Sequence, residues 1–119
     1  MPSAVTCAYH EDHTVVALAG ELDLTSGDLL RAALVRGLHD HPRLVLDLSR
    51  LTFIDSGCLS LLLAATKLAR ETDGRMRVAA PQPHVRRTLM LTRLDRVLEI
   101  YDSVEEAVAG PEPVRAGTA

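Results

Sequence analysis

The chain has 119 residues, of which 47% are hydrophobic and 24% charged, and its formal net charge is -3. This length and composition are typical of one globular domain and exclude a disordered or fibrous chain. Only 3% of the residues are aromatic, and the charge is negative, so we expect no direct nucleic-acid partner, which would require a positive surface and stacking rings.

The N-terminal part of the chain predicts a β-hairpin followed by a helix. Two short β-prone runs, 5–9 and 14–18, flank the polar residues 10–13, which is the pattern of a hairpin turn. An N-cap signature at 25–28 then precedes leucines and alanines at helical spacing. We therefore expect an antiparallel opening and a first helix that ends near Asp40.

The rest of the chain alternates between predicted strands and helices. Residues 43–48 form a nearly continuous apolar run, typical of a central parallel strand that is covered on both faces. A connection over 49–55 leads into a long helix at 56–71. The later predicted elements are a strand at 76–80, a helix at 81–93, a strand at 97–101 and a short helix at 103–109.

This alternation predicts the α/β class. Helices between parallel strands imply right-handed crossovers. We expect a single domain with a mixed, mostly parallel five-stranded sheet, an N-terminal antiparallel hairpin and about four helices. Residues 1–109 form the predicted domain, and 110–119, which are rich in Pro, Gly, Ala and Thr, are predicted to be a disordered tail.

From the sequence we expect a cytoplasmic protein, because no targeting signal is recognisable and the two cysteines are not spaced for a disulfide framework. The N-terminus has no pattern of an export signal, and no apolar run approaches the roughly 20 residues of a membrane span, so we expect no membrane insertion. Cys7 and Cys58 are not spaced as a CxxC pair. We expect neither a disulfide framework nor a zinc site.

The segment 46–59 contains the residues with the clearest chemical meaning. It joins a buried strand to a helix N-terminus, where unpaired N–H groups and the helix macrodipole favour a phosphate. Ser56 stands at that position, Asp55 is suited to cap the helix, and Gly57 keeps the approach to the hydroxyl open. Residue type alone leaves open that Asp55 and Ser56 are only an N-cap pair.

The helix predicted at 56–71 adds a candidate partner surface. Its apolar face contains Cys58, Leu61, Leu62, Ala65, Leu68 and Ala69. Its polar face contains Ser56, Ser60, Lys67 and Arg70, with Leu63 among them and Leu59 beside it. Single exposed leucines need no explanation, but two of them one turn apart beside a hydroxyl predict a surface for a partner.

Five short motifs occur along the chain in a characteristic order. They are Gly20-Glu21-Leu22-Asp23, Leu46-Asp47-Leu48, Phe53-Ile54-Asp55-Ser56, Val85-Arg86-Arg87 and Asp102-Ser103-Val104-Glu105-Glu106-Ala107. Together they resemble the STAS domain, which sulfate transporters and anti-sigma factor antagonists share. The chain departs from the family at Gly57-Cys58, where a second Ser or Thr followed by Gly is common. It also departs at Thr92-Arg93-Leu94, where Gly often occupies the middle position.

The resemblance implies a switch between partners and no enzyme activity. In the family, an anti-sigma factor serine kinase phosphorylates the Ser that follows the Asp, which here is Ser56. The unmodified form would bind that kinase and release a sigma factor, and a phosphatase would reverse the modification. The expected partner-binding residues are Glu21, Asp23, Asp55, Gly57, Leu59, Ser60 and Leu63. Neither a metal nor a cofactor is expected.

Other functions find less support in the sequence. A phosphorelay receiver with Asp55 as acceptor would need further acidic residues and a lysine that are not suitably placed, and a nucleotide hydrolase would need a GK[ST] loop. The His-acid clusters at 10–13 and 39–41 are typical of solvated turns, and no histidine is placed as a base for Ser56. A rival within the family remains open: a constitutive STAS-type subunit of a lipid-transport ATPase complex or a stress-signalling assembly.

Overall fold

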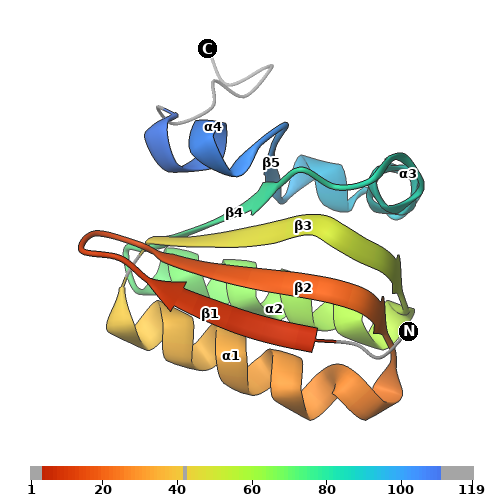
Figure 1. Cartoon of the computed structure of the whole chain (residues 1–119), viewed down its shortest axis with the longest axis horizontal. Coiled ribbons are helices and arrows are strands. Elements are labelled where there is room, and N and C mark those ends of the chain that lie inside the picture. The colour runs from red at the N-terminus through yellow and green to blue at the C-terminus, as the bar shows by residue number, and fades with distance from the viewer. Residues whose placement is uncertain (1–3, 42, 111–119) are drawn as a thin grey trace.

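Strands and helices alternate along the chain, as Figure 1 shows. The computed structural model describes residues 4–41 and 43–110. The strands are β1 (Ala4–Tyr9), β2 (Thr14–Leu22), β3 (Arg43–Ile54), β4 (Arg75–Ala79) and β5 (Glu99–Tyr101). The helices are α1 (Gly27–Asp40), α2 (Ser56–Glu71), α3 (Pro83–Leu91) and α4 (Val104–Ala109), with 3-10 turns at Leu24–Ser26 and Leu94–Arg96. The predicted tail lies outside the described residues, except for Gly110.

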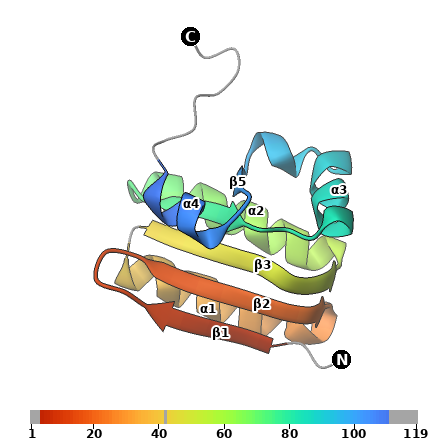
Figure 2. The same cartoon turned by 45° about the horizontal axis from the view of Figure 1, so that its top comes forward.

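The strands form one sheet in the order β1-β2-β3-β4-β5. β1 is antiparallel to β2, and all other neighbours are parallel. α1 and α2 cover one face of the sheet, while α4 packs on β3 and β4 from the other (Figures 1 and 2). The predicted α/β class, N-terminal hairpin, mixed sheet and four helices are confirmed.

Two apolar cores of unequal size lie on the two faces of the sheet. The larger one is built mainly from leucines between the sheet and the helices α1 and α2. The smaller one joins Val45, Ala79 and Ala107 beneath α4. Leu44 and Val45 are neighbours on β3 and are both buried, because a central parallel strand has packed side chains on each face.

β3 is longer than the sequence predicts, so the connection expected at 49–55 is wrong. The strand continues to Ile54, and its pairing with β2 shifts register twice beyond Asp47. The buried residues in this half are Leu48, Leu51 and Ile54, which are spaced by three instead of two. Each shift adds a residue and interrupts the alternation between faces, so the sequence pattern of this half does not resemble that of a regular strand.

The end of the second predicted strand, at residue 18, is also corrected. β2 continues to Leu22, and Gly20 lies within the strand at one of the irregular positions, with φ of 78°. Glycine adopts this left-handed conformation without a Cβ clash. The chain turns only at Leu24–Ser26. The other predicted elements differ from the structure by no more than two residues at their ends.

Candidate functional site

Ser56 begins α2 directly after the end of β3. Asp55 caps this helix: its Oδ1 accepts the backbone N–H of Cys58 at 2.8 Å, and its own N–H donates to the Leu22 carbonyl at 3.0 Å. These bonds hold the start of α2 against the end of β2. The Ser56 side chain is exposed, and within residues 4–41 and 43–110 nothing hydrogen-bonds to its hydroxyl. Asp55 is therefore the cap, as predicted, and the Ser56 hydroxyl is not used for capping.

The end of β2 lies beside this junction. Glu21 is opposite Phe53 in the parallel pairing of β2 with β3, and both side chains are exposed. The backbone carbonyl of Asp23 accepts a hydrogen bond from the Cys58 thiol, with 3.5 Å between Sγ and O. The structure thus brings Glu21 and Asp23 to the same end of the sheet as Ser56, because adjacent parallel strands end there together.

Carboxylates determine the electrostatics at this end of the sheet. The Thr25 hydroxyl and backbone N–H donate to the Asp23 carboxylate at 2.6 and 3.0 Å, which lowers the pKa of Asp23. Burial, contact with Asp55 and the charges of Asp55 and Asp23 raise the pKa of the Cys58 thiol to about 11. The thiol is protonated at neutral pH, and the surroundings of Ser56 are negative before any modification.

The exposed surface of α2 is rotated relative to the one that its helical wheel predicts. Ser56, Gly57 and Ser60 are exposed, and Leu63 is half-buried. Ser60 Oγ donates to the Ser56 carbonyl at 3.0 Å. Leu59 is only 7% exposed and belongs to the main core. The expectation that Leu59 contributes to a partner surface is therefore wrong.

The rotation of α2 about its axis explains this correction. α2 packs against both β4 and α1, so contacts from two sides decide which part of the helix is buried. Leu68, which the wheel assigns to the apolar face, is 38% exposed and lines a groove with Val35 and Leu38 of α1. A single-helix wheel contains the spacing of the residues but not the positions of these neighbours.

The start of α3 covers the free side of β3 next to Ser56, a contact that the sequence does not reveal. The pairing of β3 with β4 ends at Asp47. Beyond it, Gln82 Nε2 donates to the Ser49 carbonyl at 3.0 Å, and His84 Nε2 donates to the Thr52 carbonyl. These side chains replace the missing strand and hold α3 beside the end of β3.

Phe53 is a further candidate that the sequence analysis did not select. It is the only phenylalanine in the chain, it lies three residues before Ser56, and it is 48% exposed. Large exposed aromatic side chains are frequent anchors in protein interfaces. Phe53 begins the Phe-Ile-Asp-Ser motif, but the motif alone does not show whether its ring is buried.

The polar side chains near Ser56 do not form a catalytic arrangement within the described ranges. No histidine there hydrogen-bonds to the Ser56 hydroxyl. Among these residues, no group of three or more His, Cys, Asp or Glu side chains is placed to hold a metal ion. No helix in this part of the chain combines the length and the apolar character needed to cross a membrane.

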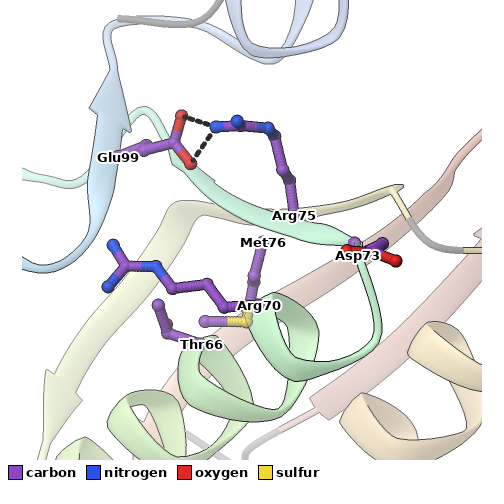
Figure 3. Close-up of a pocket in the computed structure, with 7 residues that line it drawn as sticks. Thr66, Arg70, Asp73, Arg75, Met76 and Glu99 are labelled. Atoms are coloured by element: carbon purple, nitrogen blue, oxygen red, sulfur yellow. Dashed lines mark hydrogen bonds and ion pairs between the residues drawn. The ribbon is translucent and has the colours of Figure 1, made fainter.

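A polar cavity of about 480 Å³ lies elsewhere in the fold (Figure 3). Its lining residues are Thr66, Arg70, Asp73, Gly74, Arg75, Met76 and Glu99. Arg75 Nη1 is 3.4 Å from each oxygen of the Glu99 carboxylate. Both residues begin their strands, whereas Ser56 follows the end of β3. The cavity is therefore at the opposite end of the parallel strands from Ser56.

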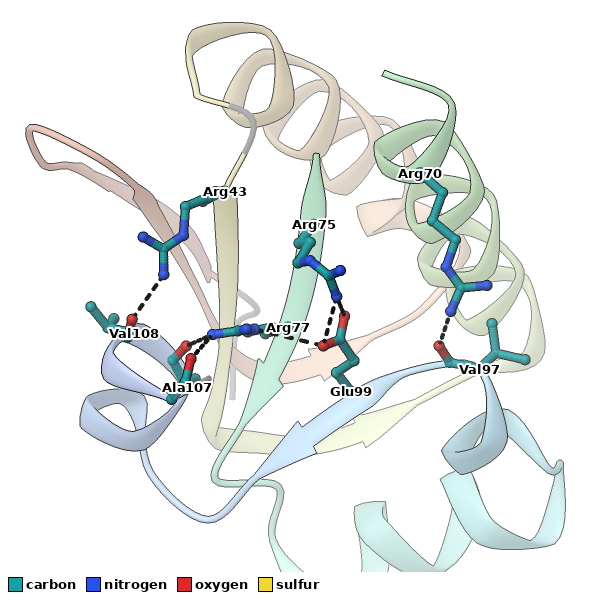
Figure 4. A network of polar contacts seen from close by, with 9 residues as sticks. Arg43, Arg70, Arg75, Arg77, Val97, Glu99, Ala107 and Val108 are labelled. Atoms are coloured by element: carbon teal, nitrogen blue, oxygen red, sulfur yellow. Dashed lines mark hydrogen bonds and ion pairs between the residues drawn. The ribbon is translucent and has the colours of Figure 1, made fainter. Parts of the chain in front are cut away.

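Arginines from the sheet attach the C-terminal helix (Figure 4). Arg77 is 5% exposed, and its Nη1 donates to the carbonyls of Ala107 and Gly110 at 2.7 and 2.8 Å. Arg43 Nη2 donates to the Val108 carbonyl at 3.0 Å. Guanidinium groups at a helix C-terminus bind its unpaired carbonyls and complement the macrodipole. These contacts stabilise α4 on β3 and β4.

Sequence comparisons match the chain to a known family and to known proteins. A family model described as "Mlab, STAS domain" matches residues 5–109. The anti-sigma F factor antagonist of Paenibacillus polymyxa is 34% identical over 110 residues, which cover 89% of this chain and 92% of that protein. The anti-sigma-F factor antagonist RsfB of Mycobacterium tuberculosis is 31% identical over 114 residues, which cover 95% of this chain and 90% of that protein.

A solved structure shows the same fold. The crystal structure of an anti-sigma factor antagonist from Mycobacterium paratuberculosis matches with a TM-score of 0.78 and 29% sequence identity. The match covers 90% of this chain and 92% of that chain. The similarity therefore extends over most of the fold.

Proposed function

The chain belongs to the STAS domain family, and on that premise we propose that it is an anti-sigma factor antagonist switched off by phosphorylation of Ser56. In the proposed cycle, the unmodified protein binds an anti-sigma factor serine kinase, and this binding frees a sigma factor. The kinase then phosphorylates Ser56, and a phosphatase restores the unmodified form. The protein acts as a binding partner and a substrate, not as a catalyst, and needs no metal or cofactor.

The exposed and unbonded hydroxyl of Ser56 is the observation that carries the proposal. A kinase must reach the acceptor oxygen, and here Asp55 makes the capping bond to Cys58 N–H at 2.8 Å. Modification of Ser56 therefore leaves the cap of α2 unchanged. The relatives named as anti-sigma factor antagonists support the choice of partner.

The charges around Ser56 support an effect on the partner and not on the fold. A phosphate adds roughly 1.5 to 2 negative charges at a helix N-terminus, which stabilises anions. The fold tolerates it for that reason. A partner that fits the neutral hydroxyl, by contrast, meets added charge beside Asp55, and it must desolvate a phosphate to keep its contacts.

We propose that the partner contacts the exposed and half-buried residues around Ser56. From the expected set these are Glu21, Asp23, Asp55, Gly57, Ser60 and Leu63, to which we add Phe53. Leu59 is withdrawn because it is buried. The Phe53 ring supplies an apolar anchor for the partner.

The experiment is phosphorylation by candidate anti-sigma factor kinases with ATP, followed by intact mass. We expect the mass of one added phosphate in the wild type and in Ser60→Ala, and none in Ser56→Ala. Ser60 is the matched control, because it is an exposed serine one turn further along α2. A phosphate that persists in Ser56→Ala would place the modification elsewhere.

Binding to the same kinases without ATP, by calorimetry, tests the switch itself. Ser56→Ala should bind like the wild type, and Ser56→Asp should bind at least about tenfold more weakly, because its charged side chain must be desolvated against a surface that fits the neutral hydroxyl. If Ser56→Asp binds its partner like the wild type, the switch is wrong and the constitutive-subunit function replaces it.

A further inference from the structure

The outer edge of β1 has no strand beside it in the described part of the chain (Figures 1 and 2). Its six residues, Ala4–Tyr9, include no charged residue and no proline. Exposed edges of this kind pair with other strands unless charges, prolines or bulges prevent it. The opposite edge, β5, has three residues, and its Glu99 is paired with Arg75 at 3.4 Å. β1 is thus the unprotected edge of the sheet.

The hairpin determines which backbone groups of β1 face outward. His10 N–H donates to the His13 carbonyl at 2.9 Å and closes the hairpin. Hydrogen-bonded pairs alternate along antiparallel strands, so the groups of Ala4, Thr6 and Ala8 point toward β2. The N–H and C=O groups of Val5, Cys7 and Tyr9 therefore point away from the sheet.

We propose that β1 is a self-association edge through which two copies of this chain pair antiparallel, with the two-fold axis at Cys7. In this register Cys7 faces the partner's Cys7, and Val5 faces the partner's Tyr9. All three outward-facing residues of each strand then form hydrogen-bonded pairs. A shift by one residue would place outward-facing groups opposite inward-facing ones, and no charge on either strand opposes the pairing.

The side chains also fit this register. Val5 and Cys7 are half-buried against the main core, whereas Tyr9 is 48% exposed. The pairing covers each Tyr9 ring with a β-branched side chain directly opposite, a favourable cross-strand combination. Hydrogen-bonded antiparallel pairs have Cα atoms about 5.5 Å apart, within the distance range of a disulfide. A disulfide between the Cys7 residues of two copies would therefore identify the proposed register.

Oxidative cross-linking with copper phenanthroline, read on non-reducing gels, tests the axis. We expect disulfide dimers in the wild type and in Cys58→Ala, and none in Cys7→Ser. The matched control is Cys7→Ser combined with Val5→Cys, which moves the thiol to another half-buried position on the same edge. In the proposed register the two Val5 Cα atoms are about 14 Å apart, so this variant should not cross-link. Equal cross-linking at both positions would overturn the proposal.

Charge variants test the pairing without a covalent bond. Thr6 and Ala8 are exposed and face each other across the proposed interface. Thr6→Lys with Ala8→Glu places opposite charges there, and Thr6→Lys with Ala8→Lys places like charges. By sedimentation velocity under reducing conditions, the Lys/Lys variant should dissociate at roughly tenfold higher concentration than the Lys/Glu variant. The inference is wrong if the two variants associate alike, or if the wild type is monomeric at every concentration.

Discussion

Replacing Asp55 separates its role as a helix cap from its role as a charge beside Ser56. Asp55→Ala removes the oxygen that accepts the Cys58 N–H at 2.8 Å and leaves that N–H without its cap. The loss of an N-cap side chain costs about 1 kcal/mol, which lowers the melting temperature of a domain of this size by about 4 °C. Asp55→Asn keeps an acceptor at the same position, so its loss of stability should be less than half that of Asp55→Ala.

Urea and thermal unfolding at neutral pH, followed by circular dichroism, measure this difference. Ser60→Ala is the control: its hydroxyl bonds only within α2, and exposed substitutions of this kind change stability by about 0.5 kcal/mol or less. Equal losses in Asp55→Ala and Asp55→Asn, or no loss in Asp55→Ala, would refute the capping argument. In a fully folded Asp55→Asn variant, weaker partner binding would then measure the effect of the charge alone.

Four further substitutions test other parts of the fold. Arg93 has φ of 62°, so Arg93→Gly should raise the free energy of unfolding in urea by about 1 kcal/mol by relieving a left-handed conformation. Arg77→Leu should lower the melting temperature, because it removes the donor to the carbonyls of Ala107 in α4 and of Gly110 directly after it. It also removes one ion partner of the Glu99 carboxylate, 3.7 Å away. The double variant Arg77→Leu with Glu99→Leu should regain part of the lost melting temperature, since the Glu99 carboxylate is then no longer buried beside a missing partner. The raised pKa of Cys58 favours the folded state at low pH. Stability in urea should therefore fall as the pH rises from 9.0 to about 11. Cys58→Ala should weaken this dependence, and the raised pKa of Tyr9 accounts for a remaining part.

Local patterns in the sequence were sufficient to predict most elements of the fold. The helix cap at Asp55 was predicted from residue type, and its side chain accepts a backbone N–H three residues further along the chain. The apolar run at 43–48 predicted a central strand because a strand covered on both faces has no polar side. These features depend on residues within one or two turns, so the sequence by itself contains them.

The sequence also determined the candidate site at Ser56. Its position depends on a strand, an N-cap and a helix that follow one another directly, and the Phe53-Ile54-Asp55-Ser56 motif marks this junction. The family resemblance placed Glu21 and Asp23 in the expected partner-binding set. The bonds from Thr25 to Asp23 and from Cys58 to the Asp23 carbonyl were not predicted from the sequence.

Only the tertiary structure decided the remaining features. The extension of β3 to Ile54 depends on register shifts against β2, and the burial of Leu59 depends on the rotation of α2. The packing of α3 beside the end of β3 depends on a hydrogen bond from His84. The hydrogen bonds of Arg77 also depend on the tertiary structure, because its carbonyl partners lie 30 and 33 residues away in the chain. Periodicity describes one element at a time, whereas register, rotation and long-range hydrogen bonds arise from contacts between elements that are distant in the chain.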